Sequence, residues 1–190
     1  MEEWHLDILR SVKEAVRVPV AVKLSPYFSA TGEMARRLDE AGANGLVLFN
    51  RFLQPDIDPE TLAVVRAASL SVAAEARLPL TWIALLHGRI GASLAATTGV
   101  ESSTELIKYL LAGADVVMTA SALLRHGPEH AAVLLDGLCE WMGRKGYTTV
   151  EELRGLLAVP VGVDETARER GDHVSALRQA NSTDYSPGDE

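Results

Sequence analysis

The chain has 190 residues, with 18 basic and 26 acidic side chains and a net charge of −8 at neutral pH. Its apolar share of 47% and charged share of 23% are those of a globular protein and exclude disorder for most of the chain. The acidic balance argues against a general nucleic-acid binder, because phosphate contacts need clustered Lys and Arg. The single cysteine, Cys139, excludes an internal disulfide and favours a cytoplasmic protein. No apolar run reaches the roughly 18 to 20 residues of a membrane span.

Four short apolar runs predict strands of one parallel sheet. They span residues 18–25, 45–50, 92–99 and 115–120. None alternates between apolar and polar residues, as a strand with one solvated face would. We therefore expect both faces of the sheet to be buried.

Helical patterns lie between and after these runs, at residues 33–41, 79–87, 102–111 and 128–144. The third is the best defined, because Ser102 and Glu105 have the spacing of a capping box and Gly113 follows as a stop. Alternating strands and helices predict an α/β fold, either a doubly wound sheet or a (βα) TIM barrel with about four βα units present.

Residues 51–76 are long for a βα loop and predict a lobe inserted after the second strand. Within it, Asp58-Pro59-Glu60 is typical of a helix start, whereas residues 64–65 and 70–72 are candidates for a hairpin. Residues 148–153 predict a short terminal helix. The expected organisation is a partial barrel over 1–160 and a polar tail over 161–190, with one more helix at 168–181.

Polar residues at the carboxyl ends of the strands are the candidates for function, since parallel αβ folds bind ligands there. Lys23 interrupts an apolar strand. It holds an anionic or electron-rich ligand, forms a Schiff base, or points outwards to a carboxylate. Asn50 suits recognition of a planar amide or carboxylate, or serves as a turn residue.

Two further strand ends, Thr98-Gly99 and Ala120-Ser121, resemble the phosphate cradle that the last two loops of a barrel form. In such a cradle free backbone N–H groups meet the anion, and small residues let the backbone approach its oxygens. The histidines show no metal-ligand spacing, so no metal site is predicted.

At this point a family resemblance emerges. Residues 20–26, Val-Ala-Val-Lys-Leu-Ser-Pro, resemble the fifth-strand motif of dihydroorotate dehydrogenases, and residues 45–51 resemble their sixth strand. Residues 95–100 stand where that family has a Gly-Gly phosphate loop, and residues 112–123 are similar to its eighth strand and Gly-Thr loop. The resemblance covers roughly residues 15–158.

The resemblance implies a TIM barrel that binds FMN and oxidises a dihydropyrimidine or a similar CH–CH substrate in pyrimidine metabolism. It implies that Lys23 contacts the N1 and O2 edge of the flavin and that Asn50 binds the substrate or lines the flavin face. Ser71 would match a serine near the ribityl or phosphate group. The phosphate itself would be cradled by Thr98, Gly99, Ala120 and Ser121.

The sequence also departs from the family pattern. Thr98 replaces a Gly, Ala120-Ser121 replace Gly-Thr, and Arg51 replaces the Ser that usually follows the sixth-strand Asn. The four βα units match the second half of a barrel that needs eight. The general base is therefore expected upstream of Met1.

The expected protein is an FMN-dependent oxidoreductase fragment with a small-molecule substrate. It would be completed by a missing N-terminal half or by a second copy in a homodimer. The alternatives are a phosphate-binding barrel lyase that uses Lys23 as Schiff-base former, and a non-catalytic half-barrel module.

Overall fold

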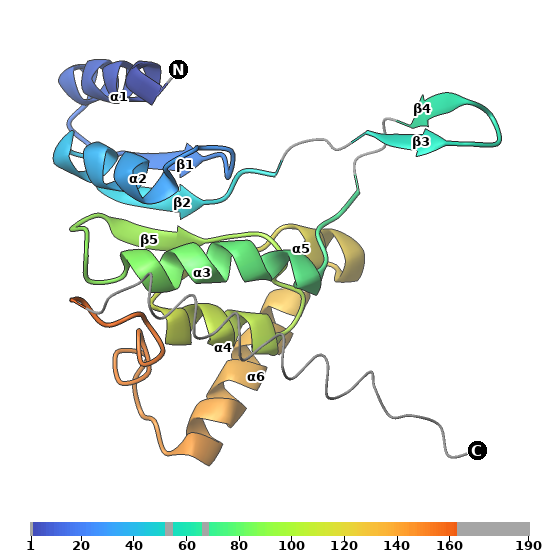
Figure 1. Cartoon of the computed structure of the whole chain (residues 1–190). Coiled ribbons are helices and arrows are strands. Elements are labelled where there is room, and N and C mark those ends of the chain that lie inside the picture. Colours follow the sequence, from blue (N-terminus) through green and yellow to red (C-terminus); the bar gives the residue numbers. More distant parts are fainter. Residues whose placement is uncertain (1, 52–54, 66–68, 163–190) are drawn as a thin grey trace, which may run out of the picture. The chain divides into compact units, whose positions relative to one another are not determined.

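The computed structural model describes residues 2–51, 55–65 and 69–162 (Figure 1). The chain divides into two compact units, residues 1–158 and 159–190, and the first contains every helix and strand of the described part. No helix in the described ranges is long and apolar enough to cross a membrane.

Four parallel strands form the main sheet, in the order β1-β2-β5-β6. Their bounds are Ala21–Leu24 for β1, Gly45–Leu48 for β2, Ser93–Ala96 for β5 and Val116–Val117 for β6. In the register, Ala21 lies opposite Gly45, which in turn lies opposite Ser93. All four predicted strands are thus confirmed, and β6 is the shortest.

The two faces of this sheet differ in burial. Leucine and alanine side chains on one face are at most 2% exposed, namely those of Leu24, Leu46, Leu48, Leu94 and Ala96. On the other face Lys23 is exposed, Val116 is 51% exposed, and Met118 beyond the end of β6 is 43% exposed. The prediction that both faces are buried is therefore wrong for one face, because within the described residues the helices cover only the other.

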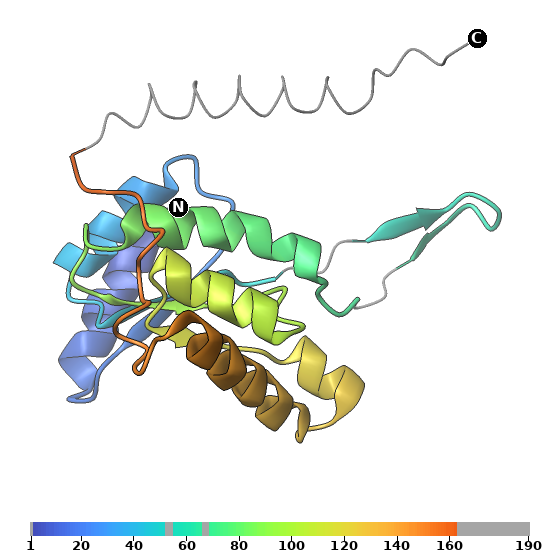
Figure 2. The same ribbon diagram turned by 90° about the horizontal axis from the view of Figure 1, so that it is seen from below.

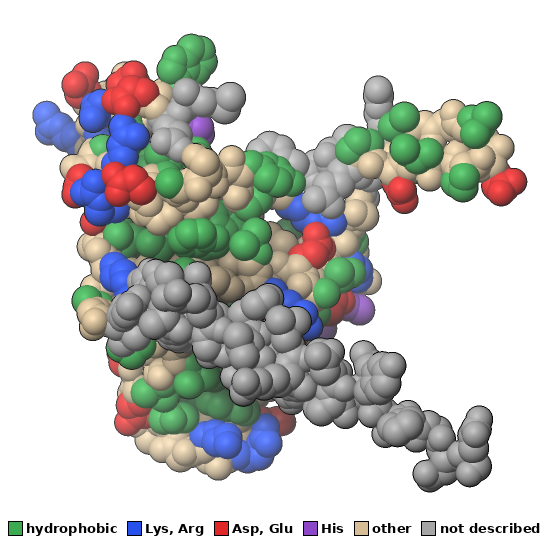
Figure 3. All heavy atoms as spheres, viewed as in Figure 1, with side chains coloured by type: hydrophobic (Ala, Val, Ile, Leu, Met, Phe, Trp, Pro, Cys, Tyr) green, Lys and Arg blue, Asp and Glu red, His purple; other side chains and the backbone are tan. Residues whose placement is uncertain are grey.

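The covering helices follow one another across the sheet in chain order. They are α1 (Glu2–Ala15), α2 (Thr31–Glu40), α3 (Arg77–Leu86), α4 (Ser103–Ala112) and α6 (His130–Lys145). Seen from below, α3, α4 and α6 lie side by side (Figure 2). Over α1 and α2 the surface carries many charged side chains, including Arg36 in ion pairs with Glu33 and Glu40 (Figure 3).

The four predicted helices are confirmed within a few residues. The capping box is formed, since the backbone N–H of Ser102 donates to Glu105 Oε2 at 3.0 Å and Thr104 N–H donates to Ser102 Oγ at 3.1 Å. Gly113 ends α4 in the left-handed region, with φ of 111°. Two α-helices of the described part were not predicted, α1 and the six-residue α5 (Ser121–His126).

The inserted lobe contains a separate antiparallel hairpin of β3 (Asp56–Asp58) and β4 (Ala63–Val65), followed by the short 3-10 helix η1 (Ala73–Ala76). The helix start predicted at Asp58 is wrong. Asp58 Oδ1 accepts from the backbone N–H groups of Glu60 and Thr61, at 2.9 and 3.3 Å, and so closes the hairpin turn. Residues 70–72 lie outside the hairpin, and its apolar side chains are exposed (Figure 3).

The segment after α6 forms successive turns and not the predicted helix at 148–153. Two of its backbone N–H groups bond to α4: Gly155 donates to the Leu110 carbonyl at 2.9 Å and Leu157 to the Leu111 carbonyl at 2.8 Å. Both carbonyls belong to the last turn of α4, and that of Leu110 also accepts from the capping N–H of Gly113. The helix predicted at 168–181 lies outside the described residues.

Candidate functional site

A cavity of about 200 Å³ lies at the carboxyl ends of the parallel strands. Every residue singled out from the sequence lines it: Lys23, Asn50, Ser71, Thr98, Gly99, Ala120 and Ser121. Their strands run in the same direction and end at one edge of the sheet, and the inserted segment brings Ser71 to that edge. Residues far apart in the sequence thus line one cavity.

Ser71 is hydrogen-bonded to two other residues that line this cavity, and it is only 7% exposed. Its backbone N–H and its hydroxyl both donate to Ser121 Oγ, at 3.0 and 2.9 Å. Its Oγ accepts from the backbone N–H of Gly99 at 3.3 Å. Ser71 therefore joins the loop after β5 to the start of α5.

The loop after β5 has an unusual backbone. Gly99 has φ of +74°, and a Cβ there would lie 2.7 Å from the Ala76 nitrogen and 3.0 Å from the Val72 carbonyl oxygen. Thr98 has φ of +81°, which a β-branched residue adopts only under strain. The loop thus approaches the residues around η1 so closely that position 99 admits only glycine.

Tyr109 supports this loop from below, and the sequence analysis did not identify it. Its hydroxyl donates to the Thr98 carbonyl oxygen at 2.7 Å, and the residue is fully buried in α4. Burial raises the pKa of Tyr109, so the phenol stays a neutral donor. Its place in the apolar stripe of α4 gave no indication of this polar role.

The charged side chains that line the cavity are basic, and one of them, Arg51, is paired with Glu75. Lys23 and Arg51 line it, and no acidic side chain does so among the described residues. Lys23 forms no ion pair with any residue in the described ranges. Such a lining favours an anion over a cation.

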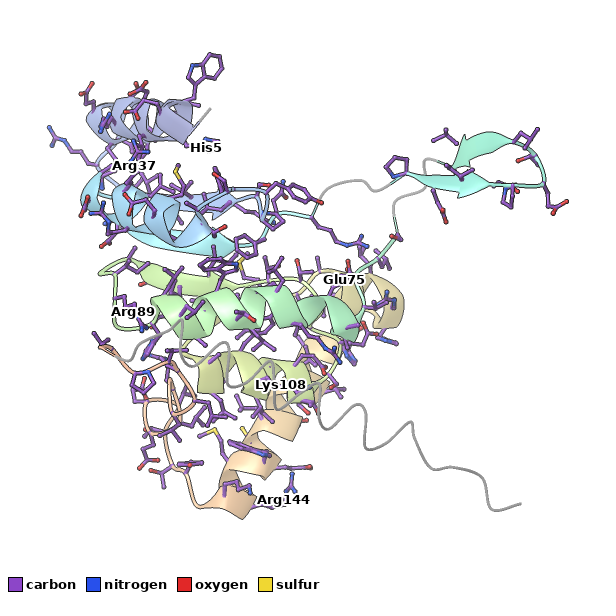
Figure 4. All side chains as sticks on the ribbon, viewed as in Figure 1. His5, Arg37, Glu75, Arg89, Lys108 and Arg144 are labelled. Carbon is purple, nitrogen blue, oxygen red and sulfur yellow. The ribbon has the colours of Figure 1, made fainter. Side chains whose placement is uncertain are left out.

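Arg51 is held on both sides by the returning inserted segment. Its Nε lies 2.9 Å from Glu75 Oε1, its Nη2 donates to Ser69 Oγ at 3.0 Å, and its Nη1 donates to the Ser69 carbonyl. Glu75 lies where this segment enters α3 (Figure 4). Burial of Glu75 acts to raise its pKa, but the Val72 N–H and Arg51 outweigh it and hold the pKa below its usual value.

A second cavity, of about 440 Å³, adjoins the first and shares four lining residues with it: Phe49, Asn50, Arg51 and Thr98. Its other walls are mainly apolar and include Tyr27, Leu78 and Pro79. Together the two cavities provide a polar end and an apolar end on either side of Asn50 and Arg51.

A charged cluster joins two of the loops at the edge of the site. Glu101 pairs with Arg125, and its Oε1 lies 3.0 Å from His126 Nε2. His130 Nε2 lies 3.0 Å from the Glu101 carbonyl oxygen. The hydrogen bond with His126 lowers the pKa of Glu101, and the charge of Arg125 acts in the same direction. Within the described residues no group of His, Cys, Asp or Glu has the arrangement of a metal site.

Comparison with known proteins identifies relatives of this chain. Residues 1–142 match the family model of dihydroorotate dehydrogenase. The catalytic subunit of dihydroorotate dehydrogenase B (NAD(+)) from Methanothermobacter thermautotrophicus is 28% identical over 159 residues, which are 81% of this chain and 52% of the relative. The dihydroorotate dehydrogenase (quinone) of Nocardia farcinica is 32% identical over 163 residues, which are 78% of this chain and 43% of the relative.

Solved structures agree on the fold. The ligand-free type DHODH of Eimeria tenella superposes with a TM-score of 0.60 at 21% identity, over 76% of this chain and 41% of that one. This likeness and the parallel sheet with its helices show a partial βα barrel, as predicted. The chain spans about half the length of the curated relatives that it matches.

Proposed function

The chain belongs to the dihydroorotate dehydrogenase family, and on this basis we propose that it is an FMN-dependent oxidoreductase. Its substrate would be a dihydropyrimidine or a similar small molecule that loses hydrogen from two adjacent carbons. The observation that carries the proposal is the convergence of the predicted FMN and substrate residues on one cavity with a basic lining. We assign the barrel to residues 1–160 and the tail to residues 161–190.

The phosphate end of FMN fits the residues of the smaller cavity. Ser71 and Ser121 provide hydroxyls, and the first turn of α5 leaves backbone N–H groups without partners inside the helix. Position 99 carries no Cβ, and Ser71, Ala120 and Ser121 in the lining are small. A phosphate monoester needs this combination of donors, close backbone and absent negative charge.

The volume of the cavity limits how much of the cofactor it takes. At about 200 Å³ it lies below the roughly 300 Å³ at which sites for whole organic ligands begin. It therefore suits the phosphate and the adjoining ribityl chain. The flavin ring would extend out of the cavity on the side that Lys23 lines.

Lys23 and Asn50 would serve the reacting end of the site. Bound FMN supplies the hydride-accepting chemistry. The ammonium group of Lys23 would hold the electron-rich edge of the ring by its charge, a role that suits its exposed position better than Schiff-base chemistry, which needs a desolvated amine. The amide of Asn50 would orient a planar substrate through one acceptor and two donors.

The general base is not assigned to any described residue, and we propose that it comes with four further βα units. The uncovered sheet face carries Val116 and Met118, and α1 exposes Trp4 and Ile8 on its outer side. A closed barrel would cover these apolar side chains, and a chain of half the relatives' length leaves room for such units. A second copy of this chain is the alternative cover.

Sedimentation tests whether a second copy of the chain covers the exposed sheet face. The purified chain is expected to self-associate through the exposed face. Val116→Glu should reduce the association, whereas Ala132→Glu on the exposed side of α6 should not. A wild-type chain that sediments as a folded monomer at high concentration would contradict an interface on this face.

Flavin fluorescence tests the proposed cofactor. FMN added to the purified chain should be quenched with micromolar affinity, and Lys23→Met should weaken binding, whereas Lys108→Met on the exposed side of α4 should leave it unchanged. If the chain is folded by circular dichroism and high micromolar FMN is not quenched, the proposed function is wrong.

A further inference from the structure

The segment that carries Ser71 is fixed on both sides by one ion pair. Arg51 binds Ser69, two residues before Ser71, through the carbonyl and the hydroxyl. On the other side Arg51 binds Glu75, whose second oxygen, Oε2, accepts from the Val72 N–H at 2.8 Å. Ser71 thus lies between two anchors: Arg51 holds Ser69, and Glu75, which Arg51 binds, holds Val72.

The same segment also packs closely against the loop after β5, which contains Thr98 and Gly99. The position of a Cβ on Gly99 would meet the Val72 carbonyl oxygen and the Ala76 nitrogen, and the Gly99 N–H donates to Ser71 Oγ. Ser71 in turn donates to Ser121. A shift of the segment would therefore move Ser71, which is a hydrogen-bond partner both of Gly99 in the loop after β5 and of Ser121 at the start of α5.

The guanidinium of Arg51 is already bound to Glu75 and Ser69, so it holds the inserted segment in place and is not free to bind an anion. Its side chain is 30% exposed and that of Glu75 is 32% exposed, so the pair is partly shielded from water. The planar guanidinium meets three acceptors in two directions, which the point charge of a lysine does not reproduce. Its charge is offset by Glu75, which lines the adjoining larger cavity.

We propose that Arg51 and Glu75 form a clamp that positions Ser71, and that this clamp gives the site its preference for a phosphorylated flavin. This inference rests on the proposed function. Arg51 is a positioning residue here, because it acts on the phosphate through Ser71, Gly99 and Ser121. Loss of either member of the clamp frees the segment and loosens the cavity, while Lys23 keeps its place in β1.

The test compares FMN with riboflavin, which lacks the phosphate, for the full chain and its variants. The wild type should bind FMN about tenfold or more tightly than riboflavin. The reason is that the riboflavin complex lacks the charge-assisted hydrogen bonds that FMN makes through its phosphate. Arg51→Ala, Arg51→Lys and Glu75→Gln should each bring this ratio close to one. Riboflavin affinity should change by no more than about twofold, and the double variant should be no worse than the single ones.

Arg77→Ala is the matched control, because Arg77 is an exposed arginine two residues beyond Glu75. It should keep the wild-type ratio. If Arg51→Ala keeps the wild-type ratio of the two affinities, whether or not both affinities fall, the clamp has no phosphate-specific role. If Arg51→Ala loses the ratio and Glu75→Gln keeps it, Arg51 contacts the phosphate directly and the positioning role is wrong.

Hydrogen exchange separates failure of the clamp from failure of the proposed function. In Arg51→Ala and Glu75→Gln the amides of Ser71 and Gly99 should exchange faster, while the amide of Leu94 in β5 should not change. A wild type that binds neither flavin overturns the proposed function, and the exchange rates then still decide whether the clamp exists. Unchanged exchange at both amides overturns the clamp.

Discussion

The buried hydroxyl of Tyr109 donates a hydrogen bond to the carbonyl oxygen of Thr98 at 2.7 Å, and so a core residue of α4 supports the loop that borders the candidate phosphate site. Thr98 needs this support because its backbone lies in the left-handed region, at φ of +81°. Packing in the core and the shape of the site are therefore linked through one bond.

Removing that bond tests the link. Tyr109→Phe should lower the free energy of unfolding by about 1–2 kcal/mol, because it removes a buried hydrogen bond and leaves the Thr98 carbonyl without its nearest partner. FMN affinity should fall with it. Urea denaturation and flavin quenching measure the two effects, with Tyr147→Phe, whose ring stacks on Trp141, as the control. Unchanged stability would show that the bond contributes nothing.

Thr98 itself is expected to be a strained residue. Thr98→Gly should be as stable as the wild type or more stable, by up to about 1 kcal/mol, since relief of the left-handed strain exceeds the entropy cost of glycine. Thr98→Ala keeps a Cβ at the same φ and should be less stable than Thr98→Gly. Urea denaturation of the three proteins gives the order, and a glycine variant that is the least stable would refute the strain.

Gly99 should tolerate no side chain. Gly99→Ala is expected to cost roughly 2–4 kcal/mol, because overpacking against Ala76 adds to the left-handed backbone conformation. Gly143→Ala in α6 is the matched control: nothing lies within 4 Å of its added Cβ, and it should stabilise the helix by about 1 kcal/mol. Thermal denaturation distinguishes them, and equal melting temperatures would contradict the close approach at position 99.

The cluster at Glu101 predicts a dependence on pH. Because the pKa of Glu101 is lowered from its ordinary 4.5, its pairing with Arg125 and His126 adds stability that is fully present above pH 4.5 and is lost as the pH falls through the lowered pKa. Glu101→Gln should therefore melt below the wild type at neutral pH and approach it as the pH falls through that lowered pKa. Glu140→Gln on the exposed side of α6 should not show this convergence. If the difference in melting temperature between Glu101→Gln and the wild type stays constant with pH, the titration of Glu101 is not linked to stability.

Much of the framework was predictable because it depends on neighbouring residues. The capping box of Ser102 and Glu105 and the stop at Gly113 operate within one or two helical turns, so their spacing identified α4. The inserted segment was harder, since Asp58-Pro59-Glu60 suits a helix start as well as a hairpin turn. The pairing of Asp58 with Ala63, which no local pattern specifies, decided between them.

The sequence by itself determined the order of strands and helices and the polar residues at the strand ends, because apolar periodicity and local turn chemistry are written in adjacent residues. The tertiary structure decided which of these residues meet. Ser71 reaches Gly99 and Ser121 across 28 and 50 residues, and Arg51 reaches Glu75 across 24. Such contacts arise from the parallel alignment of the strands and the return path of the inserted segment. The same alignment determined that one face of the sheet is packed under helices while the face with Lys23 stays exposed.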